Sequence, residues 1–411
     1  MSGAVENDRL SVIDEMFLRT HRGFGVPIVL QGIWRSDDLI ERVELSAVHA
    51  NLAHGRLGRR VVTPRIPCAR RRWTTSSAAL PLALEERPLT EAGLLDWADS
   101  QGEIDIDPEF GPGWRLSAAP VDTGGTVVSL VCSHALADAA GLIAAAGRAF
   151  EGAAPPRISA RKRSDLGDAV SLTARVTASS LRATAGLAFS RRSRREMKHY
   201  LHAAGRLEPH DVRISTAVFE IDATISNPEF IALVADIAAE LGEPHPISVN
   251  VPFRSSAPGA NGIGMATIEV SQSDSPAEIK SACKSAFARP AGAPSGFPAE
   301  MVQLLPESIA ASMTLSPGTA RVLCSNIGPL PNSIRRIGAH PASALATRAI
   351  HPHSDSARTV TALSAYISSM DGRSTLSLVG TDDHLIASSE ALRDCTHAVL
   401  ARRELGARSW R

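Results

Sequence analysis

Long apolar runs are missing from this 411-residue sequence, because no stretch approaches the ~18 uninterrupted apolar residues of a membrane-spanning helix. The start, MSGAVENDRL, has no positively charged segment followed by an apolar core, so no export signal is expected. A net charge is missing too: Lys plus Arg and Asp plus Glu both number 43. No overall field therefore favours nucleic acid or an anionic membrane. We expect a cytoplasmic protein that acts on a small molecule or another protein, with no transmembrane segment and no nucleic-acid partner.

Paired cysteines and several common catalytic motifs are also missing. The five cysteines are odd in number, widely scattered and free of any CxxC pair, which argues against a disulfide framework and against a zinc site. The patterns GxSxG, GxxxxGK[ST] and HExxH do not occur. We therefore expect no bound metal and no disulfide-stapled scaffold.

The apolar content is high enough for two hydrophobic cores. Hydrophobic residues make up 44% of the sequence, and chains of this length divide into domains. Strand and helix patterns alternate in both halves, which predicts an α/β (α+β) fold. Between Gly152 and His210 the composition shifts to proline, basic residues and an Ala/Ser/Thr-rich helical pattern. We predict a first domain over residues 1–155, a mostly helical connection over 156–208 and a second domain over 209–411.

Hydrophobic periodicity predicts the individual elements. Helices are predicted over residues 10–18, after an N-cap at Asp37 or Asp38, and over 138–150, 228–241 and 388–405. Strands are predicted over residues 26–34, 114–116, 126–132, 212–221, 247–253, 321–325, 360–367 and 375–380. The second and third of these strands should pair across a turn at residues 122–125, which contains Gly-Gly.

The stretch VVSLVCSHALADAAGLIAAAGRAF contains the most informative histidine. An apolar strand runs into His134, and Asp138 follows four residues later, where a helical pattern begins. Such a strand end delivers a side chain to a cleft, and an imidazole, with an ordinary pKa of about 6.5, is suited to act as a general base. A satisfied buried histidine is an equally open interpretation of His134 taken in isolation.

A second HxxxD pattern runs from His351 to Asp355. It contains proline, lies in a polar stretch and follows no clear apolar strand, so we interpret it as a loop. With 13 histidines, chance alone should produce on the order of one such pattern in this chain. The HxxxD pattern alone is therefore weak evidence for a catalytic histidine, and the residues around each copy must be considered.

The surroundings of His134 resemble the N-terminal half of condensation-domain-like acyltransferases. This group belongs to the chloramphenicol acetyltransferase-like superfamily, with nonribosomal peptide condensation domains, wax ester synthases and polyketide-associated (phthiocerol dimycocerosyl transferase-type) acyltransferases. The resemblance covers most of the chain, with the order of its blocks preserved. The blocks are Gly111-Pro112-Gly113-Trp114-Arg115-Leu116, SHALAD at 133–138, VNVPFR at 249–254 with Asn261-Gly262-Ile263-Gly264, Cys324-Ser325-Asn326-Ile327-Gly328-Pro329, and Asp371-Gly372-Arg373.

The resemblance implies a fold and a set of site residues. It implies two chloramphenicol acetyltransferase-like α/β sandwich domains with the active site at their interface. His134 would be the catalytic base. Asp138 would point away from the imidazole and pair with Arg254, holding the histidine loop in shape, and Ser325 or Asn326 would donate to the oxyanion or position the substrate. No cofactor would be bound, and the residues that contact the co-substrate stay unknown.

The resemblance also implies an activity. An acyl group would pass from an acyl-CoA or acyl-carrier-protein thioester to a small-molecule alcohol, namely the hydroxyl of a lipid, polyketide or other natural product. The partner would then be an acyl carrier protein or a polyketide synthase. Two alternatives stay open: an amide-forming condensation enzyme, and a non-catalytic relative that binds a carrier protein or a lipid.

Two positions near His134 depart from the pattern of many relatives. Ser133 stands where the first of two histidines is common, and Ala139 and Ala140 precede Gly141 where a glycine directly after the aspartate is common. The missing glycine is expected to narrow the turn or the channel beside the base.

A basic cluster over residues 191–198 ends the helical pattern of the connection. We interpret it as a solvated helix end, in preference to a site for a CoA phosphate or an acidic carrier protein.

Overall fold

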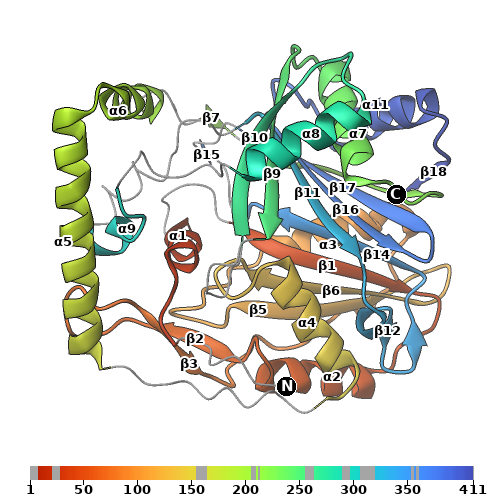
Figure 1. Cartoon of the computed structure of the whole chain (residues 1–411). Coiled ribbons are helices and arrows are strands. Elements are labelled where there is room, and N and C mark those ends of the chain that lie inside the picture. Colours follow the sequence, from red (N-terminus) through yellow and green to blue (C-terminus); the bar gives the residue numbers. More distant parts are fainter. Residues whose placement is uncertain are drawn as a thin grey trace.

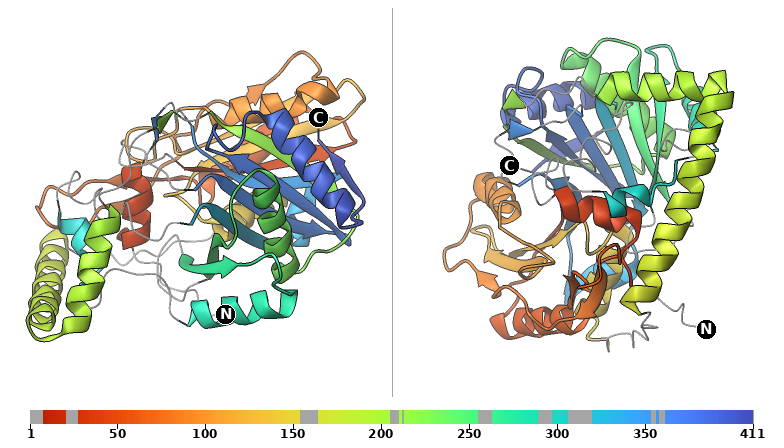
Figure 2. Two further views of the ribbon diagram at one scale, coloured as in Figure 1. Left: turned by 90° about the horizontal axis from the view of Figure 1, so that it is seen from above. Right: turned by 90° about the vertical axis from the view of Figure 1, so that its left-hand side faces the viewer.

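The computed structural model describes residues 8–20, 28–153, 164–204, 210–211, 213–254, 263–288, 297–305, 320–352, 356–357 and 361–410. Asn261 and Gly262 of the predicted glycine loop and Asp355 of the second HxxxD pattern lie outside these ranges. Two large sheets form two lobes, and a long helical arm stands beside them (Figures 1 and 2). The predicted α/β (α+β) class, with two sandwich-like halves, is confirmed.

The first sheet has five strands and is covered by helices on both faces. Apolar side chains of α2 and α4 pack on one face, against Leu116 and Leu130, and α3 packs on the other, against Ile33 and Val127. The alternation of side chains along a strand explains why successive residues reach different helices. In spatial order the strands are β14 (Ala344–Ile350), β1 (Val29–Ser36), β6 (Thr126–Ser133), β5 (Trp114–Pro120) and β4 (Ala83–Leu84), with helices α2 (Arg42–His54), α3 (Leu94–Gly102) and α4 (Ala139–Phe150).

The second sheet has seven strands, and three helices pack on it. Phe219, Val249 and Leu378 contribute to its core together with the apolar face of α7. In spatial order the strands are β10 (Ile263–Val270), β9 (Ile247–Arg254), β11 (Val322–Pro329), β16 (Leu363–Met370), β17 (Arg373–Gly380), β8 (Ser215–Ile221) and β18 (Ala407–Ser409), and the helices are α7 (Asn227–Glu240), α8 (Pro276–Phe287) and α11 (Ser389–Arg402).

The remaining elements are short, apart from the two helices of the arm. They are α1 (Val12–Thr20), β2 (Arg59–Val62), β3 (Arg72–Thr75), η1 (Glu91–Gly93), α5 (Asp165–Phe189), α6 (Arg191–Ala204), β7 (His210–Asp211), α9 (Met301–Leu304), η2 (Asn332–Ile334), β12 (Arg336–Ile337), β13 (His340–Pro341) and β15 (Ser356–Ala357). No helix in the described part of the chain is long and apolar enough to cross a bilayer. The domain boundaries proposed from the sequence stay a prediction.

The predicted hairpin before His134 is confirmed, and the predicted cap of α2 is wrong. β5 and β6 pair antiparallel, and Gly124 and Gly125 take the positive φ angles, 101° and 87°, that the turn requires. Helix α2 begins only at Arg42, after Glu41 as its N-cap. Asp38 lies before this helix start, and its carboxylate contacts the His340 ring at 3.1 Å instead.

The second half of the chain contributes a strand to the first sheet. β14 pairs antiparallel with β1, whose other edge pairs with β6 (Figure 1). β14 also contacts β16 and β17 of the second sheet. One strand therefore contacts both sheets, and its position helps to set the space between them.

A buried polar network holds β14 against β1. The Arg348 side chain is fully buried, and its Nε donates to Gln31 Oε1 at 2.8 Å. Gln31 in turn donates to the carbonyl of Ala98 in α3 at 2.6 Å. The Asp99 carboxylate forms an ion pair with the Arg348 guanidinium at 2.5 Å, although the two groups are not aligned for a hydrogen bond. The same carboxylate accepts a hydrogen bond from the Thr216 hydroxyl of β8 at 2.7 Å. The network thus ties both sheets and α3 together.

Asp99→Asn should lower the free energy of unfolding by about 2 kcal/mol, because it leaves the Arg348 charge buried and unneutralised. The loss is smaller than for a fully buried pair because a third of the Asp99 side chain reaches water. Denaturant unfolding measures it, with Asp96→Asn on the exposed side of the same helix as the control. Equal midpoints for the two variants would contradict the role of this pair.

Candidate active site

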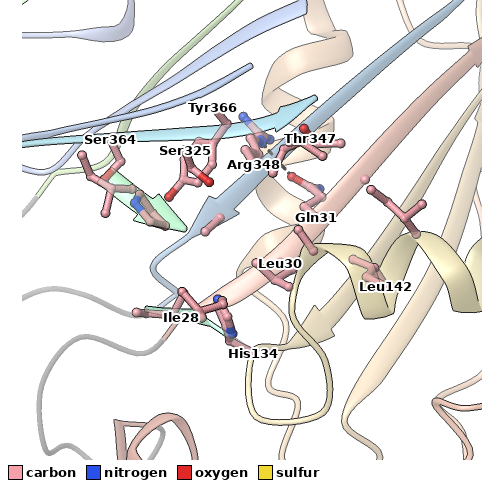
Figure 3. A pocket seen from close by; sticks show the side chains of 18 of the residues that line it. Ile28, Leu30, Gln31, His134, Leu142, Ser325, Thr347, Arg348, Ser364 and Tyr366 are labelled. Carbon is pink, nitrogen blue, oxygen red and sulfur yellow. Dashed lines mark hydrogen bonds between the residues drawn. The ribbon is translucent and has the colours of Figure 1, made fainter. Parts of the chain in front are cut away.

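A cavity with a volume of about 510 Å³ lies between the two sheets. Its walls are mostly apolar: Leu30 and Trp34 from β1, Leu142 from α4, and Leu323 and Ile327 from β11. A cavity of this size and character matches the sites that hold apolar small-molecule ligands. Both halves of the chain therefore build one pocket (Figure 3).

His134 lies in the wall of this cavity, directly after β6. Its backbone N–H donates to the Ile28 carbonyl at 3.3 Å, which extends the pairing of β6 with β1 by one residue. The imidazole stacks on the ring of Phe17 in α1, with centroids 3.7 Å apart and an interplanar angle of 13°. Only 9% of the residue is exposed. The ring is thus held in one plane and largely shielded from water.

Short local contacts shape the turn that follows His134. The Ala135 N–H donates to the Ser133 hydroxyl at 3.3 Å, and Arg59 donates to the Leu136 carbonyl. A Cβ on Gly113 of the GPGW segment would lie 2.5 Å from Cδ1 of Leu136, so a larger residue there would force the Leu136 side chain to shift. Ser133, which departs from the double-histidine pattern, is fully buried and is the last residue of β6.

Asp138 caps the helix that follows the turn. Its Oδ1 accepts from the Gly141 N–H at 2.7 Å, so the carboxylate stabilises the N-terminus of α4. A Cβ on Gly141 would lie 3.2 Å from that oxygen, which makes this glycine a close neighbour of the cap. Ala139, where many relatives have glycine, lines the cavity.

Arg254 ends β9, and its side chain is exposed. Pro252, two residues earlier, reaches the cavity wall. The proposed pairing of Asp138 with Arg254 stays a prediction.

The two candidate oxyanion donors lie in strand β11, and only one of them lines the cavity. Ser325 is part of the wall, opposite Ile28 and His134 in Figure 3. Asn326 is exposed, and its side-chain oxygen accepts from the Gly328 N–H at 2.8 Å, across a bulge in β11. The structure therefore brings Ser325 and His134 to one cavity and uses Asn326 for local backbone geometry.

A tyrosine that the sequence analysis did not single out lies beside Ser325. Burial raises the pKa of Tyr366 to about 12, although hydrogen bonding with Ser364 and with the backbone of Ala349 lowers it. The phenol therefore stays protonated at neutral pH and can serve the site only as a neutral group. One of two tyrosines in the whole sequence lines this cavity, and a lone tyrosine in an apolar stretch looks like core when read from sequence.

His351 also lines the cavity. It lies outside any helix or strand, as the loop interpretation expected, but the expectation that no clear apolar strand precedes it was wrong. A buried strand, β14, directly precedes it. Val29 pairs with Ser133 on one side and with Ile350 on the other, so the next row across the sheet is His134, Ile28 and His351. Adjacent strands lie ~4.8 Å apart, so the Cα atoms of the two histidines are about 10 Å apart. Side-chain alternation directs both toward the cavity.

Solved structures with the same architecture span nearly the whole chain. A wax ester synthase/diacylglycerol acyltransferase from Marinobacter aquaeolei VT8 superposes with a TM-score of 0.55 at 12% identity, covering 96% of this chain and 98% of that one. The first condensation domain of the CDA synthetase gives 0.52 at 12%, covering 98% and 95%. This chain has the condensation-domain-like fold. Polyketide synthase associated protein 5 from Mycobacterium tuberculosis gives 0.51 at 14%, covering 96% and 98%.

The likeness is one of fold, because sequence comparison with family models and with curated proteins finds no match. The condensation-domain-like fold has two lobes, as the resemblance of the sequence motifs implied. Among the described residues, no group of three or more His, Cys, Asp and Glu side chains is arranged to hold a metal ion.

Cys132 lies two residues before His134 in this condensation-domain-like chain and is completely buried. Burial raises the pKa of its thiol to about 12, against a smaller opposing effect of the Arg59 charge. A thiol that stays protonated is a poor nucleophile. The interpretation of Cys132 as a packing residue agrees with its place in the first core.

Cys132 should resist alkylation at pH 8, where a thiol with a pKa of about 12 is ionised only to about one part in ten thousand. Cys68 is exposed and serves as the reactive control in the same sample. Mass spectrometry after brief iodoacetamide treatment of the folded protein measures both sites. Labelling of Cys132 at the rate of Cys68 would overturn the packing assignment.

Proposed function

We propose that this chain is an acyltransferase that moves an acyl group from a thioester to a hydroxyl, with His134 as general base. The observation that carries the proposal is the placement of one stacked, largely buried imidazole in the wall of a large apolar cavity. A base needs hydrogen-bond reach to the attacking atom, and the cavity provides space for an apolar acyl chain beside it.

The proposed reaction needs one base and no covalent intermediate. A ring nitrogen of His134 takes the proton of the acceptor hydroxyl as its oxygen attacks the thioester carbonyl. The resulting tetrahedral oxyanion collapses, the C–S bond breaks, and the imidazolium returns the proton to the departing thiolate. The Ser325 hydroxyl is the candidate donor to the oxyanion. Asp138, and Arg254 as its proposed partner, act by holding the turn.

The apolar walls of the cavity favour an apolar acyl group, but they favour no particular acceptor. The donor we propose is an acyl-CoA or an acyl-carrier-protein thioester, and the acceptor is the alcohol of a lipid, polyketide or other natural product. The polar groups of the wall include the neutral hydroxyls of Ser325, Ser364 and Tyr366, which suit an uncharged carbonyl. The donor is a co-substrate, so the proposal requires no bound cofactor.

His134→Ala should lower acceptor-dependent thiol release from acyl donors about 10²- to 10⁴-fold, because it removes the general base. His397→Ala, an exposed histidine on α11, is the matched control and should retain the wild-type rate. Release of free thiol from a panel of acyl-CoA and acyl-carrier-protein donors, with pooled alcohols and amines, measures the effect.

The acceptor panel separates the alternatives. Turnover with amines only would identify an amide-forming condensation enzyme. Equal, background rates for wild type and His134→Ala on every donor would favour a non-catalytic protein that binds a carrier protein or a lipid.

Ser325→Ala should lower the turnover number about 100-fold, as expected for loss of one oxyanion donor. Asn326→Ala should change turnover only a few-fold and instead lower thermal stability, since its side chain bonds to Gly328. Steady-state kinetics and thermal unfolding of the two variants check this division. A larger kinetic loss for Asn326→Ala than for Ser325→Ala would reverse the assignment.

A further inference from the structure

The α5–α6 arm stands apart from both sheets, at one edge of the molecule (Figures 1 and 2). Helix α5 has 25 residues and is therefore about 37 Å long. Its N-terminal end is fastened to the body by two ion pairs, Asp165 with Arg9 and Asp168 with Arg70, each at 2.6 Å. Ala169, Leu172, Val176 and Ala183 lie on its buried side. The opposite side of the helix faces away from the body.

That outward side of α5 carries several large apolar side chains, with Thr177 and Thr184 between them. Leu166, Val170, Leu181 and Phe189 are 64%, 62%, 67% and 90% exposed, and they make up half of the eight most exposed large apolar side chains among the described residues. At 100° per residue the first three fall within an arc of about 60°. Exposed large apolar groups gathered on one helix indicate an interaction surface, whereas scattered ones do not.

Helix α6 adds a basic stripe to the same arm. Arg191, Arg194, Arg195 and Lys198 follow the i, i+3, i+4, i+7 spacing of a single helix face, and all four side chains are exposed. Arg194 also donates to the carbonyls of Leu187 and Ala188, at 2.9 and 2.7 Å, which holds the turn from α5 into α6. The balanced charge of the whole chain conceals this local excess.

We infer that the α5–α6 arm docks the protein on an anionic lipid surface, with Phe189 and the outward side of α5 in the apolar boundary and the stripe of α6 against the headgroups. Helices that combine exposed Phe and Leu with clustered Lys and Arg bind at such an interface. A second copy of this chain would meet its own positive charge. An acidic carrier protein would complement the positive charge of the α6 stripe, but it would leave the apolar side of α5 exposed to water.

The proposal is independent of the proposed acyl transfer, because docking is measured without any substrate. The full chain is mixed with vesicles of phosphatidylcholine alone, or of phosphatidylcholine with phosphatidylglycerol in about equal amounts, and bound protein is separated by flotation. We expect binding to the mixed vesicles, weak binding to phosphatidylcholine alone, and release from the mixed vesicles at high salt.

Two variants test the two parts of the surface. Arg191→Gln/Arg195→Gln/Lys198→Gln should weaken binding to the mixed vesicles about fivefold per charge removed, which is about 100-fold in total, and it keeps Arg194 at the turn. Leu181→Ser/Phe189→Ser should weaken binding about tenfold or more through loss of apolar contact. The control is Val43→Ser/Phe110→Ser, which removes exposed apolar groups elsewhere and should bind as the wild type does.

Unchanged circular dichroism and thermal midpoints show that the variants fold. Equal binding of wild type and both variants to mixed vesicles, or no binding by the wild type, overturns the proposal. Two other results would also overturn it. In the first, the wild type does not bind vesicles but forms a dimer that Leu181→Ser/Phe189→Ser disrupts. In the second, the wild type binds only an acidic carrier protein. Thiol release with water-soluble substrates should be the same for all of these variants, so failure of docking and failure of the proposed activity are distinguished.

Discussion

The pairing of β14 with β1 is the constraint on which the rest of the structure depends. This strand comes from the second half of the chain, yet it completes the first sheet and contacts β16 and β17 of the second. The buried Arg348 fixes its place, because a charge removed from water must keep Gln31 and Asp99 within reach. This one position helps to set the distance between the sheets, and with it the cavity.

The arrangement also explains why reactive and apolar groups coexist in one pocket. β1 lies between β6 and β14, so the end of the sheet brings His134 and His351 to either side of Ile28. Farther along the same strands, Leu30 and Trp34 give the cavity an apolar wall, while Gln31, Thr347 and Arg348 add polar groups to it. The two histidines thus lie together at one end of these three strands.

The elements that depend on local sequence were predictable, and those that depend on distant partners were not. The β5–β6 hairpin, the α4 helix after Asp138 and the strand that contains Val249 each have an apolar period or a glycine turn of their own. β14 escaped prediction because Arg348 interrupts its apolar pattern, and only the folded chain reveals that Gln31 and Asp99 neutralise it. The strand before His351 was missed for the same reason. His134 was identified because its strand is continuous and apolar.

The inner end of the cavity has a further consequence for what can occupy it. Gly32 leaves room for the Trp34 indole, which a Cβ at that position would meet at 2.5 Å, and the indole N–H donates to the Ile334 carbonyl at 2.9 Å. From Ile28 to Trp34 the strand advances about 20 Å. A flexible hydrocarbon lying along it would gain about 0.8 kcal/mol for each methylene it buries, until it meets that fixed ring. The length of this apolar wall would then limit how much of a hydrocarbon chain the pocket can bury.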